Sequence, residues 1–135
     1  EERHEAAILV RRRGRVLIWR YTEGQRWAGL WDFPRFPVSS SDPEALRREL
    51  GEALRRRTGI AARLGARLKR LKHGVTRFRI TLDCYEATYI AGRHGQAGPN
   101  EIRWVAPGEL AEYPFCTTGR ELSRLAGGGN DKVTG

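Results

Sequence analysis

The chain has 135 residues, of which 39% are hydrophobic, enough to bury the core of one ordinary domain. Lysine and arginine total 25 against 16 acidic residues, and the resulting net charge of +9 favours a polyanionic partner such as nucleic acid. The sequence contains no candidate membrane span or export signal, so we expect a soluble, cytoplasmic protein. Cys84 and Cys116 lie far apart without clustered histidines, which excludes a disulfide framework and a zinc or iron–sulfur site.

The first part of the chain predicts a covered β-sheet. Residues 6–12 and 15–21 are β-rich runs on either side of Arg13 and Gly14, so we expect a hairpin. Both runs are almost uniformly apolar, which is typical of strands buried on both faces. The segments expected next are a loop and a short strand, at 22–30 and 31–33.

The sequence predicts a helix over residues 43–58. Ser41 to Glu44 combine a capping residue, a proline for the first turn and a glutamate that can reach back to the cap. Apolar residues then recur at helical spacing, at Leu46, Leu50, Ala53 and Leu54. Gly59 ends the helix.

Two alternating strands should follow, within residues 62–69 and 78–84, each with one buried and one polar face. Cations dominate both polar faces: Arg63, Arg67, Lys69, Arg77 and Arg79. A polar turn, a short strand and two helical pieces are expected at 92–99, 102–105, 107–112 and 117–125. The order indicates an α+β sandwich, with a domain over 1–126 and a glycine-rich tail over 127–135 that we expect to be disordered.

The loop and helix from Val38 to Ile60 resemble the 23-residue signature of the Nudix hydrolases. The resemblance implies an α/β/α sandwich with a mixed β-sheet. Aligned on Gly59, the register puts Glu44 on the first glutamate of the signature. Its Arg-Glu and Glu-Glu positions hold other residues: Glu52, Ala53, Arg56 and Arg57.

The catalytic part of this signature is therefore degenerate. In working members of the family the clustered carboxylates hold divalent cations against a pyrophosphate, and arginines at those positions would repel the metal. We therefore expect no catalytic residue, metal or cofactor in this domain. A hydrolase remains the alternative, and it would need an unrelated cage built from Glu44, Glu49 and Glu52.

Three further segments resemble the C-terminal domain of MutY-type adenine DNA glycosylases, which recognises 8-oxoguanine. They are Arg26-Trp-Ala-Gly-Leu-Trp-Asp-Phe-Pro-Arg35, the turn and strand over 72–82, and Glu101-Ile-Arg-Trp-Val-Ala-Pro-Gly-Glu-Leu110 with its continuation over 113–120. Together with the helix they cover most of the chain. At the family's Phe-Ser-His tip this sequence has Val75, Thr76 and Arg77, which keeps the hydroxyl but changes the aromatic ring and the imidazole.

The resemblance implies two sets of site residues. Those expected to contact 8-oxoguanine are His73, Gly74, Val75, Thr76 and Arg77. Those expected to contact phosphates are Arg26, Arg63, Arg67, Lys69, Lys72 and Arg79. We interpret Trp27 and Trp31 as core residues rather than base-stacking residues, and His73 as part of a turn rather than a catalyst.

The family also implies partners: duplex DNA with an 8-oxoguanine:adenine pair, and an N-terminal glycosylase domain with its own iron–sulfur cluster. Such a protein would work at the bacterial nucleoid. Three functions stay open at this point, namely lesion recognition in DNA, nucleotide hydrolysis and protein interaction. The lost carboxylates argue against the second, and the basic strand faces argue against the third.

Overall fold

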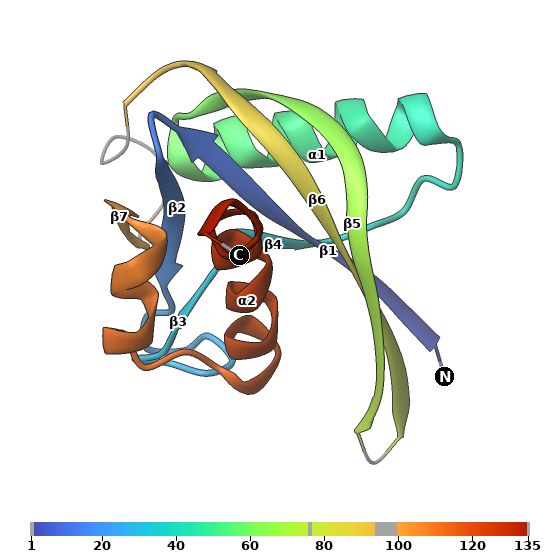
Figure 1. Ribbon diagram of the computed structural model, residues 1–135. Helices are drawn as coiled ribbons and strands as arrows, with labels where there is room; N and C mark the ends of the chain where they lie inside the picture. The colour runs from blue at the N-terminus through green and yellow to red at the C-terminus, as the bar shows by residue number, and fades with distance from the viewer. Residues whose placement is uncertain (1, 76, 94–99, 135) are drawn as a thin grey trace.

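A mixed sheet of seven strands lies between helix α1 on one face and helices η1 and α2 on the other (Figure 1). The computed structural model describes residues 2–75, 77–93 and 100–134, with residues 75 and 128–134 described through their backbone only. None of the helices in this part of the chain could span a membrane. The layers confirm the predicted α+β sandwich with a mixed sheet.

The elements in chain order are β1 (Glu2–Arg12), β2 (Arg15–Arg20), β3 (Trp31–Asp32), β4 (Arg35–Pro37), α1 (Pro43–Thr58), β5 (Ala61–Val75), β6 (Phe78–Ala91), β7 (Glu101–Val105), η1 (Pro107–Glu112) and α2 (Thr117–Thr134). The main path of the sheet runs β3-β2-β1-β6-β5, while β4 pairs with β1 and β7 pairs with β2. Strands β1 and β6 are parallel, and the other named pairs are antiparallel.

The predicted first hairpin is confirmed, and β1 lies at the centre of the sheet. Arg13 and Gly14 both have positive φ, 51° and 77°, as a two-residue turn of type I′ requires. Strand β1 is buried on both faces, and its residues alternate between two clusters. The α1 core contains Ala6, Ile8, Val10, Tyr85 and the buried leucines of α1, and the α2 core contains Ala7, Leu9, Cys84 and Leu122.

Helix α1 has the predicted bounds. Asp42 caps it, since its carboxylate accepts a hydrogen bond of 3.0 Å from Ala45 N. Gly59 ends it in the left-handed conformation, with φ 82° and its N–H donating to Arg55 O. The residues that face the sheet are those of the predicted stripe: Leu46, Leu50, Ala53 and Leu54.

Several boundaries differ from the predicted ones. Strands β5 and β6 are longer than expected and form one long hairpin that extends beyond the rest of the sheet (Figure 1). Strand β4 was not predicted, and α2 ends at Thr134 rather than at 125. Helix α2 therefore extends over most of the segment 127–135, where we expected a disordered tail after a boundary at 126. Residues 94–99 of the expected polar turn lie outside the described residues.

The alternation expected in β5 is also wrong over part of its length. Register shifts occur between Leu64 and Arg67 and again between Arg67 and Lys69. Each such bulge reverses the face on which the next residues lie. As a result Ala66 and Leu68, expected in the core, are exposed.

Candidate functional site

The end of α1 holds an arginine where the hydrolase signature has its last glutamate. Arg57 Nη2 donates a hydrogen bond of 3.1 Å to Asn100 Oδ1, and its guanidinium carbon lies 5.4 Å from the ring centre of Trp19. Arg56 is exposed and Ala53 is buried. The signature's frame is therefore present in three dimensions without the carboxylates that would bind a metal at its end.

The glutamates of the alternative cage do not come together. Both carboxylate oxygens of Glu49 accept hydrogen bonds from the loop before the helix, from Ser39 N, Ser39 Oγ and Ser40 N, at 2.8 to 3.1 Å. These bonds hold the pKa of Glu49 below its usual value, although desolvation acts to raise it. Glu44 and Glu52 are exposed. Among the described residues, no group of three His, Cys, Asp or Glu side chains could hold a metal ion, so the chain does not fit the magnesium that the signature implies.

A buried ionic network lies beside this frame. Glu5 accepts hydrogen bonds from Arg26 at 3.2 Å and from Arg35 at 3.3 Å, and Arg35 also forms an ion pair of 3.0 Å with Asp32. Tyr21 Oη donates to the same Asp32 carboxylate at 2.7 Å. Burial acts to lower the pKa of Arg35, but the neighbouring carboxylates outweigh it and raise that pKa. The carboxylates and guanidinium groups of the network compensate one another's charge, as charged groups inside a protein usually do.

A cavity of about 150 Å³ opens between this network and α1, with Trp19, Arg35 and Arg57 in its walls. Trp19 Nε1 and Arg35 Nε are buried and have no hydrogen-bond partner among the described residues. A polar cavity of this kind has room for ordered water. The two tryptophans interpreted as core residues both pack inward, because Trp31 is 5% exposed and Trp27 packs against the α1 core.

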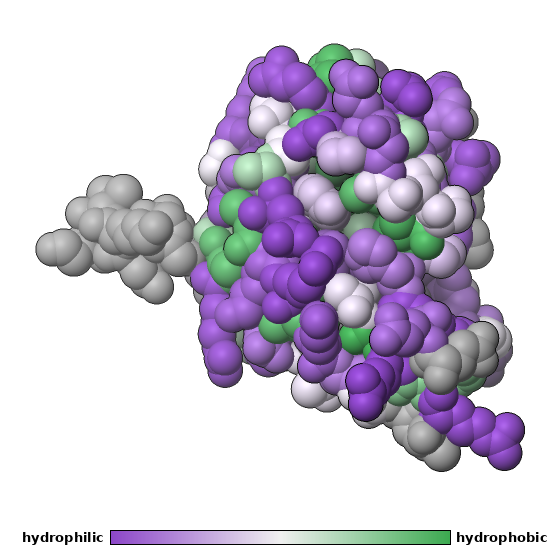
Figure 2. Space-filling view, turned by 90° about the vertical axis from the view of Figure 1, so that its right-hand side faces the viewer, coloured by the Kyte–Doolittle hydropathy of each residue, from purple (hydrophilic) through white to green (hydrophobic). Residues whose placement is uncertain are grey.

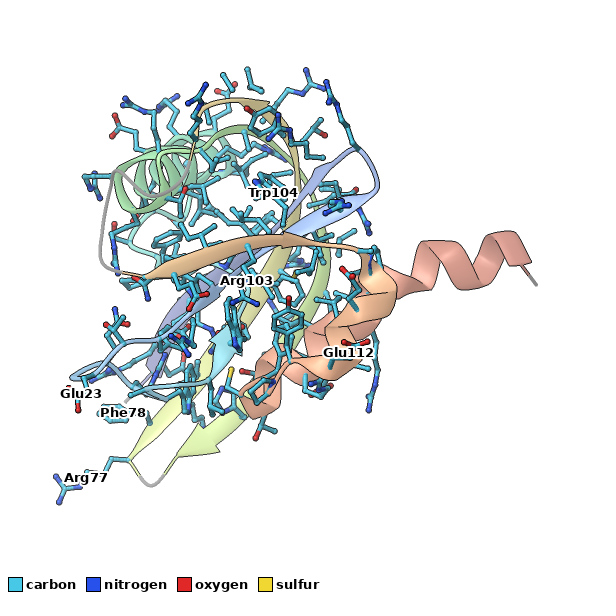
Figure 3. All side chains as sticks on the ribbon, turned by 90° about the vertical axis from the view of Figure 1, so that its left-hand side faces the viewer. Glu23, Arg77, Phe78, Arg103, Trp104 and Glu112 are labelled. Atoms are coloured by element: carbon cyan, nitrogen blue, oxygen red, sulfur yellow. The ribbon has the colours of Figure 1, made fainter. Side chains whose placement is uncertain are left out.

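The residues expected to contact 8-oxoguanine lie at the end of the β5–β6 hairpin. His73 and Gly74 are the last residues of β5 before Val75, and Arg77 extends away from the body of the molecule (Figure 3). Thr76 and the side chain of Val75 lie outside the described residues. His73 Nε2 is buried without a hydrogen-bond partner in the part of the chain described. Of this set, the structure places His73, Gly74 and Arg77 together at one projecting end.

An aromatic ring lies near the tip and was not predicted as a site residue from the sequence. Phe78 opens β6 opposite Val75, and the guanidinium of Arg3 stacks on it at 3.8 Å from the ring centre. The half-buried ring lies three positions after the site where the family has its tip phenylalanine. The sequence contained one signal for this role, because Phe78 is the aromatic residue nearest Val75, which stands where the family has its phenylalanine.

The expected phosphate-contacting residues divide between the two faces of the sheet. In an antiparallel pair, residues directly opposite each other point to the same face. Arg67 lies opposite Tyr85 of the α1 core, so it points to the face that α1 covers. Thr81, which lies opposite Lys72, and Arg79 precede Tyr85 on β6 at every second position, so Lys72 and Arg79 are on that face too. These three cations lie along the same face of the hairpin.

The other three do not join them. Lys69 lies opposite Cys84 of the α2 core and points to the opposite face, and Arg63 points the same way. Arg26 is in the loop after β2, where it pairs with Glu5 and stacks on Trp27 at 4.0 Å. The register shifts in β5, which no residue pattern signals, cause the division within the hairpin.

A charged cluster at the middle of the hairpin was not predicted from the sequence. Asp83 was expected on a polar face, but its side chain is 1% exposed. Arg70 donates to it through Nε and Nη2 at 2.7 and 3.0 Å, and His4 Nε2 lies 2.8 Å from it. Desolvation acts to raise the pKa of Asp83, but the hydrogen bonds from Arg70 and His4 outweigh it and lower that pKa. The carboxylate therefore stays ionised and orients Arg70.

Comparisons with known proteins agree with this fold. A family model of the NUDIX domain matches residues 5–124. The MutT NUDIX hydrolase from Burkholderia pseudomallei is similar in structure, with a TM-score of 0.76 and 21% identity over 92% of this chain and 97% of that one. The E. coli ORF135 protein gives 0.72 and 24% over 92% and 87%. The C-terminal domain of mouse MUTYH, solved in complex with human PCNA, gives 0.67 and 21% over 97% and 91%. A search of curated proteins finds no match to the chain.

Proposed function

The chain belongs to the NUDIX domain family, and we propose that it recognises 8-oxoguanine opposite adenine in duplex DNA without hydrolysing nucleotides. The observation that carries the proposal is the position of Arg57. Its guanidinium takes the place of the signature's last glutamate and is bound by Asn100 and stacked on Trp19. A fixed cation there would repel the divalent metal on which hydrolysis depends.

The proposed reading element is the end of the β5–β6 hairpin. Ordinary guanine presents N7 and O6 as acceptors in the major groove. Oxidation at C8 turns N7 into an N–H donor, which a backbone carbonyl or the Thr76 hydroxyl can accept. The same acceptors would repel the N7 of undamaged guanine, so discrimination comes partly from repulsion.

The proposal also includes a partner. In MutY-type proteins, adenine is removed by an N-terminal glycosylase domain that carries an iron–sulfur cluster. We expect this chain to work with such a domain in the same polypeptide, at the bacterial nucleoid, while itself using no cofactor. The structural similarity to the mouse MUTYH C-terminal domain supports this assignment at the level of the fold.

Nucleotide hydrolysis is the alternative, because a MutT hydrolase shares the fold equally well. Incubation of the purified chain with 8-oxo-dGTP and Mg²⁺ or Mn²⁺ distinguishes the two functions. We expect no release of phosphate or pyrophosphate above a blank. Turnover that is lost in Glu52→Gln would establish the alternative instead.

Recognition is tested by measuring binding to four matched duplexes that differ in one base pair: 8-oxoguanine or guanine, opposite adenine or cytosine. We expect tightest binding to the 8-oxoguanine:adenine duplex. Thr76→Ala should reduce the preference for the lesion over guanine by about tenfold, since a base-edge contact contributes about 1–3 kcal/mol. Thr88→Ala, the same change at an exposed position far along β6, is the matched control and should keep the preference. Equal affinity of the unmodified chain for lesion and guanine duplexes would contradict the proposal.

A further inference from the structure

Three hollows on the α1 face of the sheet share their walls. The largest, of about 780 Å³, lies between the start of α1 and the middle of the β5–β6 hairpin. A second, of about 330 Å³, shares His4 and Arg70 with it. A third, of about 320 Å³, shares Lys72 and Thr81 with the second and reaches Arg79 near the hairpin end. The three hollows follow one another from the start of α1 toward the hairpin end, and together we call them the strand trough.

The trough exists because the hairpin is longer than the helix that covers it. Leu46 and Leu50 of α1 pack over the sheet at Tyr85. Beyond that point β5 and β6 continue away from α1 (Figure 1), and residues of the same sheet face, such as Asp83 and Thr81, line the hollows. The part of the face beyond α1 is polar, where the part beneath α1 is apolar.

The strand trough is strongly basic. The arginines and lysines in its walls are all exposed: Arg3, Arg47, Arg67, Arg70, Lys72 and Arg79. The carboxylates among its described lining residues are Glu2 and Asp83, and Asp83 is buried beneath Arg70. Figure 2 shows the side of the molecule that carries the start of α1 and the N-terminal end of β1, where hydrophilic side chains predominate.

Asp83 also prepares one cation for a ligand. By accepting from two nitrogens of Arg70 it fixes the direction of that guanidinium, whose side chain remains 42% exposed toward the trough. An oriented guanidinium loses less conformational entropy on binding an anion than a freely moving one.

We infer that the strand trough holds the phosphodiester backbone of one DNA strand. The inference rests on the proposed function and adds to it the path of the strand, from the hairpin end toward Arg47. Cations spread along the whole trough suit a ligand with regularly repeated negative charges, whereas a single phosphate would use one end alone. Phosphate contacts carry little sequence information, but they fix the register in which the hairpin end meets the base pairs.

The first test removes one cation at each end of the trough. Arg47→Gln and Lys72→Gln should each weaken binding severalfold, by the same factor for lesion and undamaged duplexes. Each should also reduce the slope of log affinity against log salt by about one unit. Arg15→Gln makes the same charge change at an exposed position beside the turn between β1 and β2, and should change neither quantity. Far-ultraviolet circular dichroism checks that all three variants are folded.

An NMR titration with a short undamaged duplex at low salt then locates the contact, even where affinity is low. Resonance shifts should follow the trough at Arg47, Arg70 and Lys72. Two results would contradict phosphate binding in the trough and leave lesion recognition intact. One is resonance shifts confined to the hairpin end, and the other is a loss of affinity in Arg15→Gln equal to that in Arg47→Gln and Lys72→Gln. Shifts along the trough without any lesion preference would overturn the proposed function alone. If no duplex causes shifts, both lesion recognition and phosphate binding in the trough are wrong. If an acidic peptide causes shifts along the trough instead, the trough is a protein-docking surface.

Discussion

Arg57 Nη2 lies 3.1 Å from Asn100 Oδ1, and this hydrogen bond ties the end of α1 to the residue that precedes β7. Asn100 is 6% exposed and donates through Nδ2 to Arg20 O at 3.0 Å and to Gln25 Oε1 at 2.9 Å. One amide therefore joins three segments of the chain. Position 57 carries a metal-binding glutamate in the hydrolase signature, but here it carries an arginine that connects segments of the fold.

We expect Asn100→Ala to lower the free energy of unfolding by about 1–3 kcal/mol, because it leaves buried partners without hydrogen bonds. Urea unfolding followed by tryptophan fluorescence measures the change. Arg56→Ala removes an exposed neighbour of Arg57 and should stay within about 0.5 kcal/mol of the unmodified chain. If the two variants unfold alike, the amide does not join the three segments in solution.

Restoring one carboxylate should not restore hydrolysis. Arg57→Glu returns the last acidic residue of the signature, but Ala53 and Arg56 still occupy two of its other acidic positions. We expect no Mg²⁺-dependent turnover of nucleotides above a blank, because one carboxylate does not supply the oxygen ligands that Mg²⁺ requires. Activity in this single variant would mean that a nearly complete metal site had survived.

The core beneath α1 gives a stability prediction. Leu50 is fully buried against the sheet, so Leu50→Ala should cost about 2–5 kcal/mol through lost burial and the cavity left behind. Arg48→Ala, an exposed position on the same helix, should change the stability by no more than about 0.5 kcal/mol. Equal midpoints in urea for these two variants would show that the register of α1 against the sheet is wrong.

Asp83 makes the stability of the hairpin depend on pH. Its pKa is lower in the folded chain than the ordinary value of 3.8, so its contribution is fully present above that value and is lost as the pH falls through the folded pKa. The stability difference between the unmodified chain and Asp83→Asn should be largest near neutral pH and should shrink below about pH 4. A difference that is constant down to acid unfolding would show that the charge of Asp83 contributes nothing.

The two thiols should be inert in the native state. Burial raises the pKa of Cys84 to about 12 and that of Cys116 to about 11. Near neutral pH both are therefore protonated, and the thiolate is the reactive form. We expect no reaction with a thiol reagent in native buffer and two reacting thiols per chain in urea. Rapid labelling of the folded chain would show that one of the buried sites opens.

Local patterns in the sequence were enough to predict the first hairpin and α1. The turn at Arg13 and Gly14 and the leucine stripe of α1 depend on neighbours within a few residues, and both were confirmed. Strand β4 depends on a distant partner, since it pairs with β1 and the buried charge of Arg35 is compensated partly by Glu5 of that strand. A short segment beside prolines carries no local signal for such a strand.

The candidate site was harder to predict than the fold. The sequence marks Arg67, Lys69 and Arg70 as basic, but two register shifts decide which of them share a face. Those shifts follow from how β5 and β6 pair over their whole length. Arg47 lies on α1 and meets the hairpin cations only through the packing of α1 on the sheet. The contacts of Thr76 with a damaged base remain a prediction.

The parallel pairing of β1 with β6 has a consequence for how the chain is made. Glu2 pairs with Arg79 and Arg11 with Thr88, so the central strand of the sheet is synthesised long before its partner. Until β6 leaves the ribosome, the apolar β1 has one open edge, and such an edge can pair with other chains. Pairing between segments so distant in sequence is also slow, because a long loop must close before any contact stabilises it. In the interval between completion of the first hairpin and arrival of the second, the nascent chain therefore carries an apolar strand edge through which it can aggregate.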